Sequence, residues 1–141
     1  MKNLRTLLAS LLLLTAVTVS AQAEERQILT VTVPFPFAVQ NTNLPAGSYT
    51  LYTLSPFNLL KVQSVDHRRS AYVTFVRAEG SASRSAKLVF RRIGNQYFLT
   101  QAWEDGNNIH RDVPTGDLAR ELAKVGQSIH ETTILAGGGS R

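Results

Sequence analysis

Residues 29–39 alternate strictly between apolar and other residues, and this alternation constrains the fold more than any other feature of the chain. Every odd-numbered position is apolar: Leu29, Val31, Val33, Phe35, Phe37 and Val39. A period of two places these side chains on one face of an extended strand. Pro34 and Pro36 lack the N–H group that a central strand donates. We therefore expect this part of the strand at a sheet edge, or at a kink where it changes its partner strand.

Further strand-like segments, separated by turn residues, follow along the chain. We expect strands at 48–54, 59–65, 71–76, 87–93, 96–103 and 109–113, with turns at 44–47 and 55–58 and a polar hairpin tip at 66–70. Gly94 and Asn95 are typical of a two-residue hairpin turn. This spacing predicts a single, mostly β domain, an antiparallel β-sandwich or a barrel-like fold.

The period of the apolar residues changes after Pro114. Leu118, Leu122, Val125 and Ile129 are spaced as on one face of a helix, which predicts one C-terminal amphipathic helix near 117–126. We expect Asp117 to cap its start and Gly126 to weaken its end. The β-rich domain, helix included, is expected to span 24–136, and the Gly-rich residues 137–141 are expected to form a flexible tail.

The first 23 residues have the pattern of a cleavable signal peptide. Two basic residues precede an apolar run at 7–19, and Ala21-Gln22-Ala23 supplies a small-x-small cleavage pattern. The run is shorter than the ~20 residues of an ordinary membrane span. We therefore expect an exported protein, periplasmic or extracellular, that is not an integral membrane protein after cleavage.

The composition limits the chemistry that the chain can perform. The absence of cysteine excludes disulfides, a thiol nucleophile and a cysteine zinc site. Loss of Lys2 and Arg5 with the signal peptide would reduce 15 basic residues to 13, against 10 acidic ones, so the net charge would be about +3. That bias is too small for a dedicated nucleic-acid binder, and we expect no nucleic-acid partner and no cofactor.

Two motifs in the first half of the chain resemble those of a known group of proteins. The run Val31-Thr-Val-Pro-Phe-Pro-Phe-Ala-Val39 and the later Leu44-Pro-Ala-Gly-Ser-Tyr49 are similar to the VPFxFxV and LPAGxY motifs of short secreted β-rich proteins of soil bacteria. The resemblance implies a small exported β domain. That group has no assigned activity, so the resemblance implies no catalytic residues.

Catalytic chemistry has one candidate arrangement in this sequence. His110 and Asp112 are two residues apart on an expected strand, so their side chains share one face. With Glu104 or Asp105 nearby they could hold a metal ion, although exposed polar residues at a sheet rim explain the pattern more simply. We therefore predict no catalytic or metal residues, and keep a small metal-assisted hydrolase using His110, Asp112 and His67 as the alternative function.

A binding surface is the main functional expectation. Aromatic side chains on a sheet face can stack on sugar rings, and arginines attract anionic groups. The predicted surface consists of Tyr52, Tyr72, Arg68, Arg77 and Arg91. Core packing of the tyrosines and solvation of the arginines remain the alternatives for these residues.

The main hypothesis is thus an exported, non-enzymatic β domain that binds, or has a structural role, in the cell envelope or outside the cell. Its partner would be an envelope polysaccharide, lipid head groups or another exported protein. A further alternative is a subunit of a larger exported assembly, with the proline-interrupted edge at 33–37 as the contact. The sequence does not predict the oligomeric state.

Overall fold

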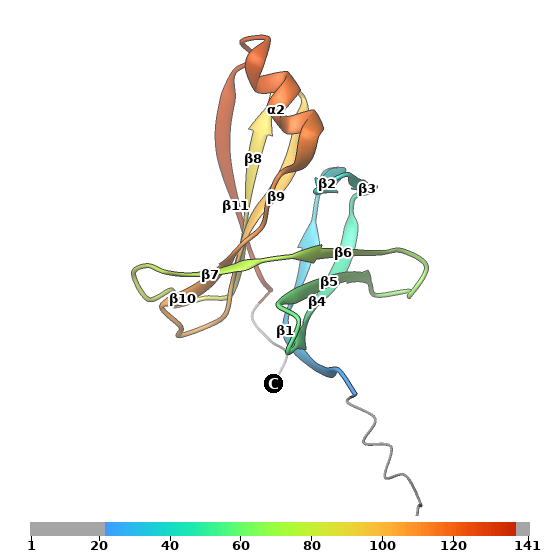
Figure 1. Cartoon of the computed structure of the whole chain (residues 1–141), viewed down its shortest axis with the longest axis vertical. Helices are drawn as coiled ribbons and strands as arrows, with labels where there is room; N and C mark the ends of the chain where they lie inside the picture. The colour runs from blue at the N-terminus through green and yellow to red at the C-terminus, as the bar shows by residue number, and fades with distance from the viewer. Residues whose placement is uncertain (1–21, 138–141) are drawn as a thin grey trace, which may run out of the picture.

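The computed structural model describes residues 22–137, which form eleven β-strands and one α-helix (Figure 1). Nearly all of the predicted signal peptide (1–23) and of the predicted tail (137–141) lies outside the described residues. Within 22–137, no helix has the length and apolar character that crossing a membrane requires. The mostly β class and the single helix near the C-terminus are as predicted.

The strands form two largely antiparallel sheets rather than one closed barrel. The first sheet has the order β1 (Glu24–Val33), β4 (Gly47–Ser55), β5 (Leu59–Ser64) and β6 (Ser70–Thr74). The second sheet has the order β11 (Ile129–Leu135), β8 (Lys87–Ile93), β9 (Gln96–Trp103), β10 (Ile109–Asp112) and β7 (Val76–Glu79), and is extended by β2 (Phe37–Val39) and β3 (Thr42–Leu44). The two sheets are adjacent in space, and β6 and β7 lie almost end to end across them (Figure 1).

The proline-containing segment carries the chain from one sheet to the other. β1 pairs with β4 in the first sheet and ends at Val33, whereas β2 begins at Phe37 and pairs with β3 and, in parallel, with β9 of the second sheet. The expected change of partner at Pro34 and Pro36 is therefore confirmed, because neither proline can donate to a ladder. Phe35 stacks on Tyr97 at 3.7 Å between ring centroids, so the segment packs within its own domain.

The core lies between the inner faces of the two sheets. Alternate residues of β1, namely Leu29, Val31 and Val33, point into it. The ring of Phe37 lies edge-on to Tyr49 at 5.2 Å and to Phe90 at 5.3 Å between centroids. These contacts join β2, β4 and β8, so both sheets share one hydrophobic core, as the sandwich prediction requires.

The helix α2 (Gly116–Lys124) packs differently from the prediction. Thr115 is its N-cap residue and makes no side-chain capping bond, while Asp117 lies inside the first turn. The buried residue of the helix is Ala119, which packs in a small cluster with Ile93 and Phe98, whereas Leu118 and Val125 are exposed. The prediction for Leu118 and Val125 was therefore wrong, while Leu122 of the predicted face does pack against this cluster.

The strand β11 was not predicted. Gly126 has a φ of +77°, which ends the helix and reverses the chain. The N–H of Gly94 then donates to the carbonyl of Ser128, and the following residues pair with β8 from Ile129 onward. Ile129 therefore belongs to a strand and not to the helix.

Candidate functional site

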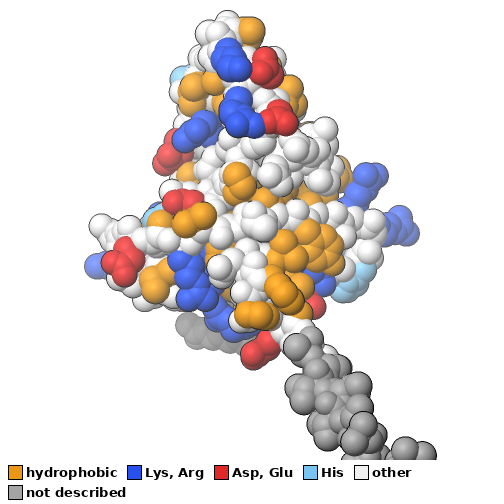
Figure 2. All heavy atoms as spheres, in the orientation of Figure 1, with side chains coloured by type: hydrophobic (Ala, Val, Ile, Leu, Met, Phe, Trp, Pro, Cys, Tyr) orange, Lys and Arg blue, Asp and Glu red, His pale blue; other side chains and the backbone are white. Residues whose placement is uncertain are grey.

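The outward side of the first sheet, which we call the tyrosine face, brings together the two predicted tyrosines. Leu60 and Val62 are buried, and the alternation of β5 turns Lys61, between them, to the other side. Lys61 pairs with Tyr52 of β4 and with Tyr72 of β6. The three side chains therefore form one row across three strands, and hydrophobic side chains are gathered on this side of the molecule in Figure 2.

Lys61 is the charged centre of this row. Its Nζ donates to Glu25 Oε1 at 2.7 Å and lies 4.8 Å from the centroid of the Tyr52 ring. The hydrogen bond to Glu25 raises the pKa of Lys61 and outweighs the opposing effect of burial, so the ammonium group stays charged. Tyr72, on the other side of Lys61, is 53% exposed. The row thus has a fixed cation beside an open aromatic ring.

Hydroxyl and amide groups surround the row on the same face. Thr30 and Thr50 share a hydrogen bond of 3.2 Å, and the side chains of Thr32 and Ser48 share one of 2.9 Å. Gln63 continues the row of Thr50 onto β5. The tyrosine face is therefore a sheet surface on which hydrogen-bonding groups lie beside aromatic rings.

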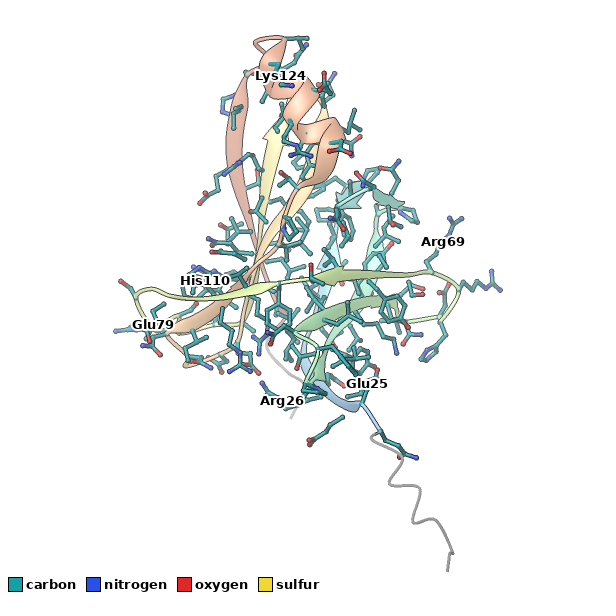
Figure 3. The ribbon with its side chains drawn as sticks, in the orientation of Figure 1. Glu25, Arg26, Arg69, Glu79, His110 and Lys124 are labelled. Atoms are coloured by element: carbon teal, nitrogen blue, oxygen red, sulfur yellow. The ribbon has the colours of Figure 1, made fainter. Side chains whose placement is uncertain are left out.

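A cleft of about 500 Å³ lies at one end of the same sheet, and we call it the arginine cleft. One wall is the turn at 45–48, part of the LPAGxY motif, and the other is the β5–β6 hairpin at 64–69. The N–H of Val65 donates to the carbonyl of Ser48 at 3.0 Å and ties the two walls together. Arg68 and Arg69 line the cleft on the hairpin side; Figure 3 shows Arg69 at the tip of the hairpin.

The other two predicted arginines lie in the second sheet. Arg77 on β7 is paired with Arg111 of β10, and Arg91 on β8 is paired with Glu131 of β11. The predicted five-residue surface is thus divided: Tyr52, Tyr72 and Arg68 belong to the first sheet and its hairpin, and Arg77 and Arg91 do not join them.

The predicted pair His110 and Asp112 does share one face, but its contacts are internal. His110 Nε2 lies 3.1 Å from Asp112 Oδ1 and 3.4 Å from Gln101 Nε2. The imidazole, in a residue only 7% exposed, stacks on Trp103 at 4.1 Å between centroids. His67 lies in the β5–β6 hairpin of the other sheet, and residues 22–137 contain no group of three or more His, Asp or Glu placed to hold a metal ion.

Glu104, the other carboxylate considered for that site, forms a separate ionic cluster. Its Oε1 accepts from Arg26 at 2.8 Å and its Oε2 from Arg111 at 3.1 Å. Burial acts to raise the pKa of Glu104, but the hydrogen bonds and charges of Arg26 and Arg111 outweigh it and hold the pKa below its ordinary value. Arg111 is 4% exposed, and burial lowers the pKa of its guanidinium.

Lys61 and Glu25 were missed as site residues when the sequence was considered alone. The signal for Lys61 was present, since a single charged residue between Leu60 and Val62 on a strand must face outward. Glu25 had no such signal, because it lies before the alternating run that identified the strand. Comparison of the chain with family models, curated proteins and solved structures gives no match, so its function has to be inferred from these contacts.

Proposed function

We propose that this protein is an exported, non-enzymatic domain that binds a polysaccharide of the cell envelope on the tyrosine face. The observation that carries the proposal is the row Tyr52–Lys61–Tyr72, which places aromatic, cationic and hydrogen-bonding groups side by side on an open sheet surface. The signal-peptide pattern at 1–23 supports export.

The chemistry of this face suits a sugar chain. A pyranose ring has C–H groups on its faces and hydroxyl groups around its edge. The exposed ring of Tyr72 offers a flat apolar surface for the former, while Lys61 and Glu25 offer a donor and an acceptor for the latter. Tyr52 and Tyr72 are two strand spacings apart, about 10 Å, which is comparable to the length of two linked pyranose rings.

A metal-assisted hydrolase has less support from the contacts. The ring of His110 is stacked on Trp103, and its Nε2 is within reach of both Asp112 and Gln101. These contacts are those of a side chain that holds β9 and β10 together. His67, the third residue of that hypothesis, lies on the other sheet.

The proposal is tested by measuring the binding of the purified protein to isolated envelope polysaccharides. Tyr72→Ala should weaken binding about fivefold or more, since truncation of a central aromatic anchor commonly costs more than ~1 kcal/mol. Tyr72→Phe keeps the ring and should bind nearly as well as the wild type. Val76→Ala is the control. It shortens an exposed side chain on β7, outside the tyrosine face, and should bind normally. Unchanged binding by Tyr72→Ala, or no binding by the wild type, would overturn the proposal.

A further inference from the structure

The arginine cleft is a second feature of the first sheet, separate from the tyrosine face, and its hairpin wall is held in one conformation by its own hydrogen bonds. The carboxylate of Asp66 accepts from the hydroxyl of Ser64 at 2.7 Å and from the N–H of Arg68 at 3.0 Å. The N–H of Arg69 donates to Ser64 Oγ at 2.9 Å, and the N–H of Ser64 donates to the Arg69 carbonyl at 2.9 Å. The backbone that carries both arginines is therefore fixed.

The charge balance of the cleft is positive. Hydrogen bonds from Ser64 and from the Arg68 N–H lower the pKa of Asp66, so its carboxylate stays ionised but is already occupied by the hairpin. The guanidinium of Arg68 touches that carboxylate only at 4.0 Å, and its side chain is 85% exposed. Within residues 22–137 Arg69 makes no ion pair. The guanidinium groups of Arg68 and Arg69 are therefore available to an anionic group from outside the hairpin.

The opposite wall and the floor of the cleft are also fixed. The hydroxyl of Tyr49 donates to the carbonyl of Pro45 and so closes the turn that forms the wall. Burial raises the pKa of the Tyr49 phenol, the charge of Arg69 acts to lower this pKa, and the charge of Asp66 acts to raise it. The volume of the cleft, about 500 Å³, lies within the range of small-molecule binding sites.

We infer that the arginine cleft binds an acidic group, a carboxylate or a phosphate, of the polysaccharide that lies on the tyrosine face. A guanidinium group donates two parallel hydrogen bonds to either kind of oxyanion, which makes arginine better suited than lysine to this role. Arg69, immediately before β6, precedes Tyr72 by three residues, about 10 Å, and the alternation that turns Tyr72 outward places Arg69 on the opposite side of the sheet. A polysaccharide that reaches both would therefore pass around the end of the first sheet, at the β5–β6 hairpin. This inference rests on the proposed function and specifies its ligand as an acidic polysaccharide.

The test compares polygalacturonate with its methyl ester, which has the same sugar chain without the charge. The wild type should bind polygalacturonate about tenfold more tightly or better, corresponding to ~1.4 kcal/mol. Arg69→Gln and Arg68→Gln should each reduce that preference and leave binding of the methyl ester unchanged. Arg84→Gln removes one exposed arginine from the loop between β7 and β8 and is the charge-matched control, so it should keep the preference. Melting temperatures equal to that of the wild type would verify that the variants fold.

Competition experiments distinguish the two acidic groups. Displacement of polygalacturonate by inorganic phosphate but not by free galacturonate would identify a phosphate ester as the group recognised, and the opposite result would identify a uronate. Equal affinity for both polymers, or equal loss of preference in Arg84→Gln and Arg69→Gln, would overturn the inference. In that case, weaker binding of both polymers by Tyr72→Ala would leave the proposed function standing. Failure of the wild type to bind either polymer would remove this inference, whereas the proposed function is removed only if the wild type also fails to bind isolated envelope polysaccharides.

Discussion

Replacing Glu104 by glutamine should strongly destabilise the protein, because it leaves Arg111 as an uncompensated buried charge. Arg111 is 4% exposed, its Nη2 lies 3.1 Å from Glu104 Oε2, and its Nε and Nη1 have no hydrogen-bond partner within the described residues. Removing one partner of a buried ion pair typically costs about 3–5 kcal/mol. Glutamine keeps an acceptor oxygen for Arg111, so we expect the lower end of this range, about 3 kcal/mol.

A loss of this size is a large part of the ~5–15 kcal/mol that stabilises an ordinary domain. Thermal unfolding followed by circular dichroism should show a fall in melting temperature of roughly 10 °C, since 1 kcal/mol corresponds to a few degrees for a domain of about this length. Glu79→Gln, at an exposed position of β7, is the control and should change stability by no more than about 0.5 kcal/mol. The double variant with Arg111→Met should regain part of the loss, because it removes the unpaired charge. A melting temperature for Glu104→Gln equal to that of the control would show that the buried charge of Arg111 does not depend on the Glu104 carboxylate.

Three other predictions concern the titration of Glu104, the hydrogen bond of Tyr49 and the packing of Trp103. The pKa of Glu104 lies below its ordinary 4.5 in the folded state, so its ion pairs should stabilise the protein fully above that pH and progressively less as the pH falls through the lower folded value. Melting curves should show this dependence, and it should be weaker in Glu104→Gln, where the lowered pKa of Asp66 still contributes. Tyr49→Phe removes the donor to the Pro45 carbonyl and should cost about 1 kcal/mol in urea unfolding; no change would mean that water replaces this bond. Gly80→Ala places a Cβ 2.8 Å from Trp103 Cη2, so it should cost about 1–3 kcal/mol and shift the fluorescence of this single tryptophan, whereas an unshifted spectrum would contradict the packing described.

The strand pattern and the change of sheet were predictable because they depend on local chemistry. Alternation of apolar residues determines which side of a strand is buried, and Pro34 and Pro36 interrupt any ladder wherever they occur. Gly94 and Asn95 fix a hairpin whose strands pair as expected. These features need no information from the rest of the chain.

The end of the helix and the strand after it depended on distant residues. Ile129 continues the helical spacing of Leu118, Leu122 and Val125, so periodicity alone assigns it to the helix. In the structure, the turn at Gly126 brings the following chain to the free edge of β8. The seven residues of β11 form backbone hydrogen bonds with that edge, so Ile129 is in a strand and not in the helix. The sequence before Ile129 contains no sign of that edge.

The candidate site was predicted in part for a similar reason. The expected turn at 55–58 is centred where the β4–β5 hairpin turns, and it brings Tyr52 opposite Lys61. The β5–β6 hairpin is centred one or two residues earlier than the expected tip at 66–70, and this shift brings Tyr72 opposite the same lysine. Arg77 and Arg91 were grouped with them only because the order of strands across two sheets is not visible in the sequence.

Binding of an acidic sugar chain at the tyrosine face can be mapped by the backbone amide chemical shifts of the purified protein, recorded while oligogalacturonate is added. We expect the largest changes at Lys61, Tyr72 and their neighbours on β4, β5 and β6, followed by Arg68 and Arg69 at the cleft. Changes confined to β9 and β10 around His110, or no changes at concentrations where the polymer binds, would contradict this expectation.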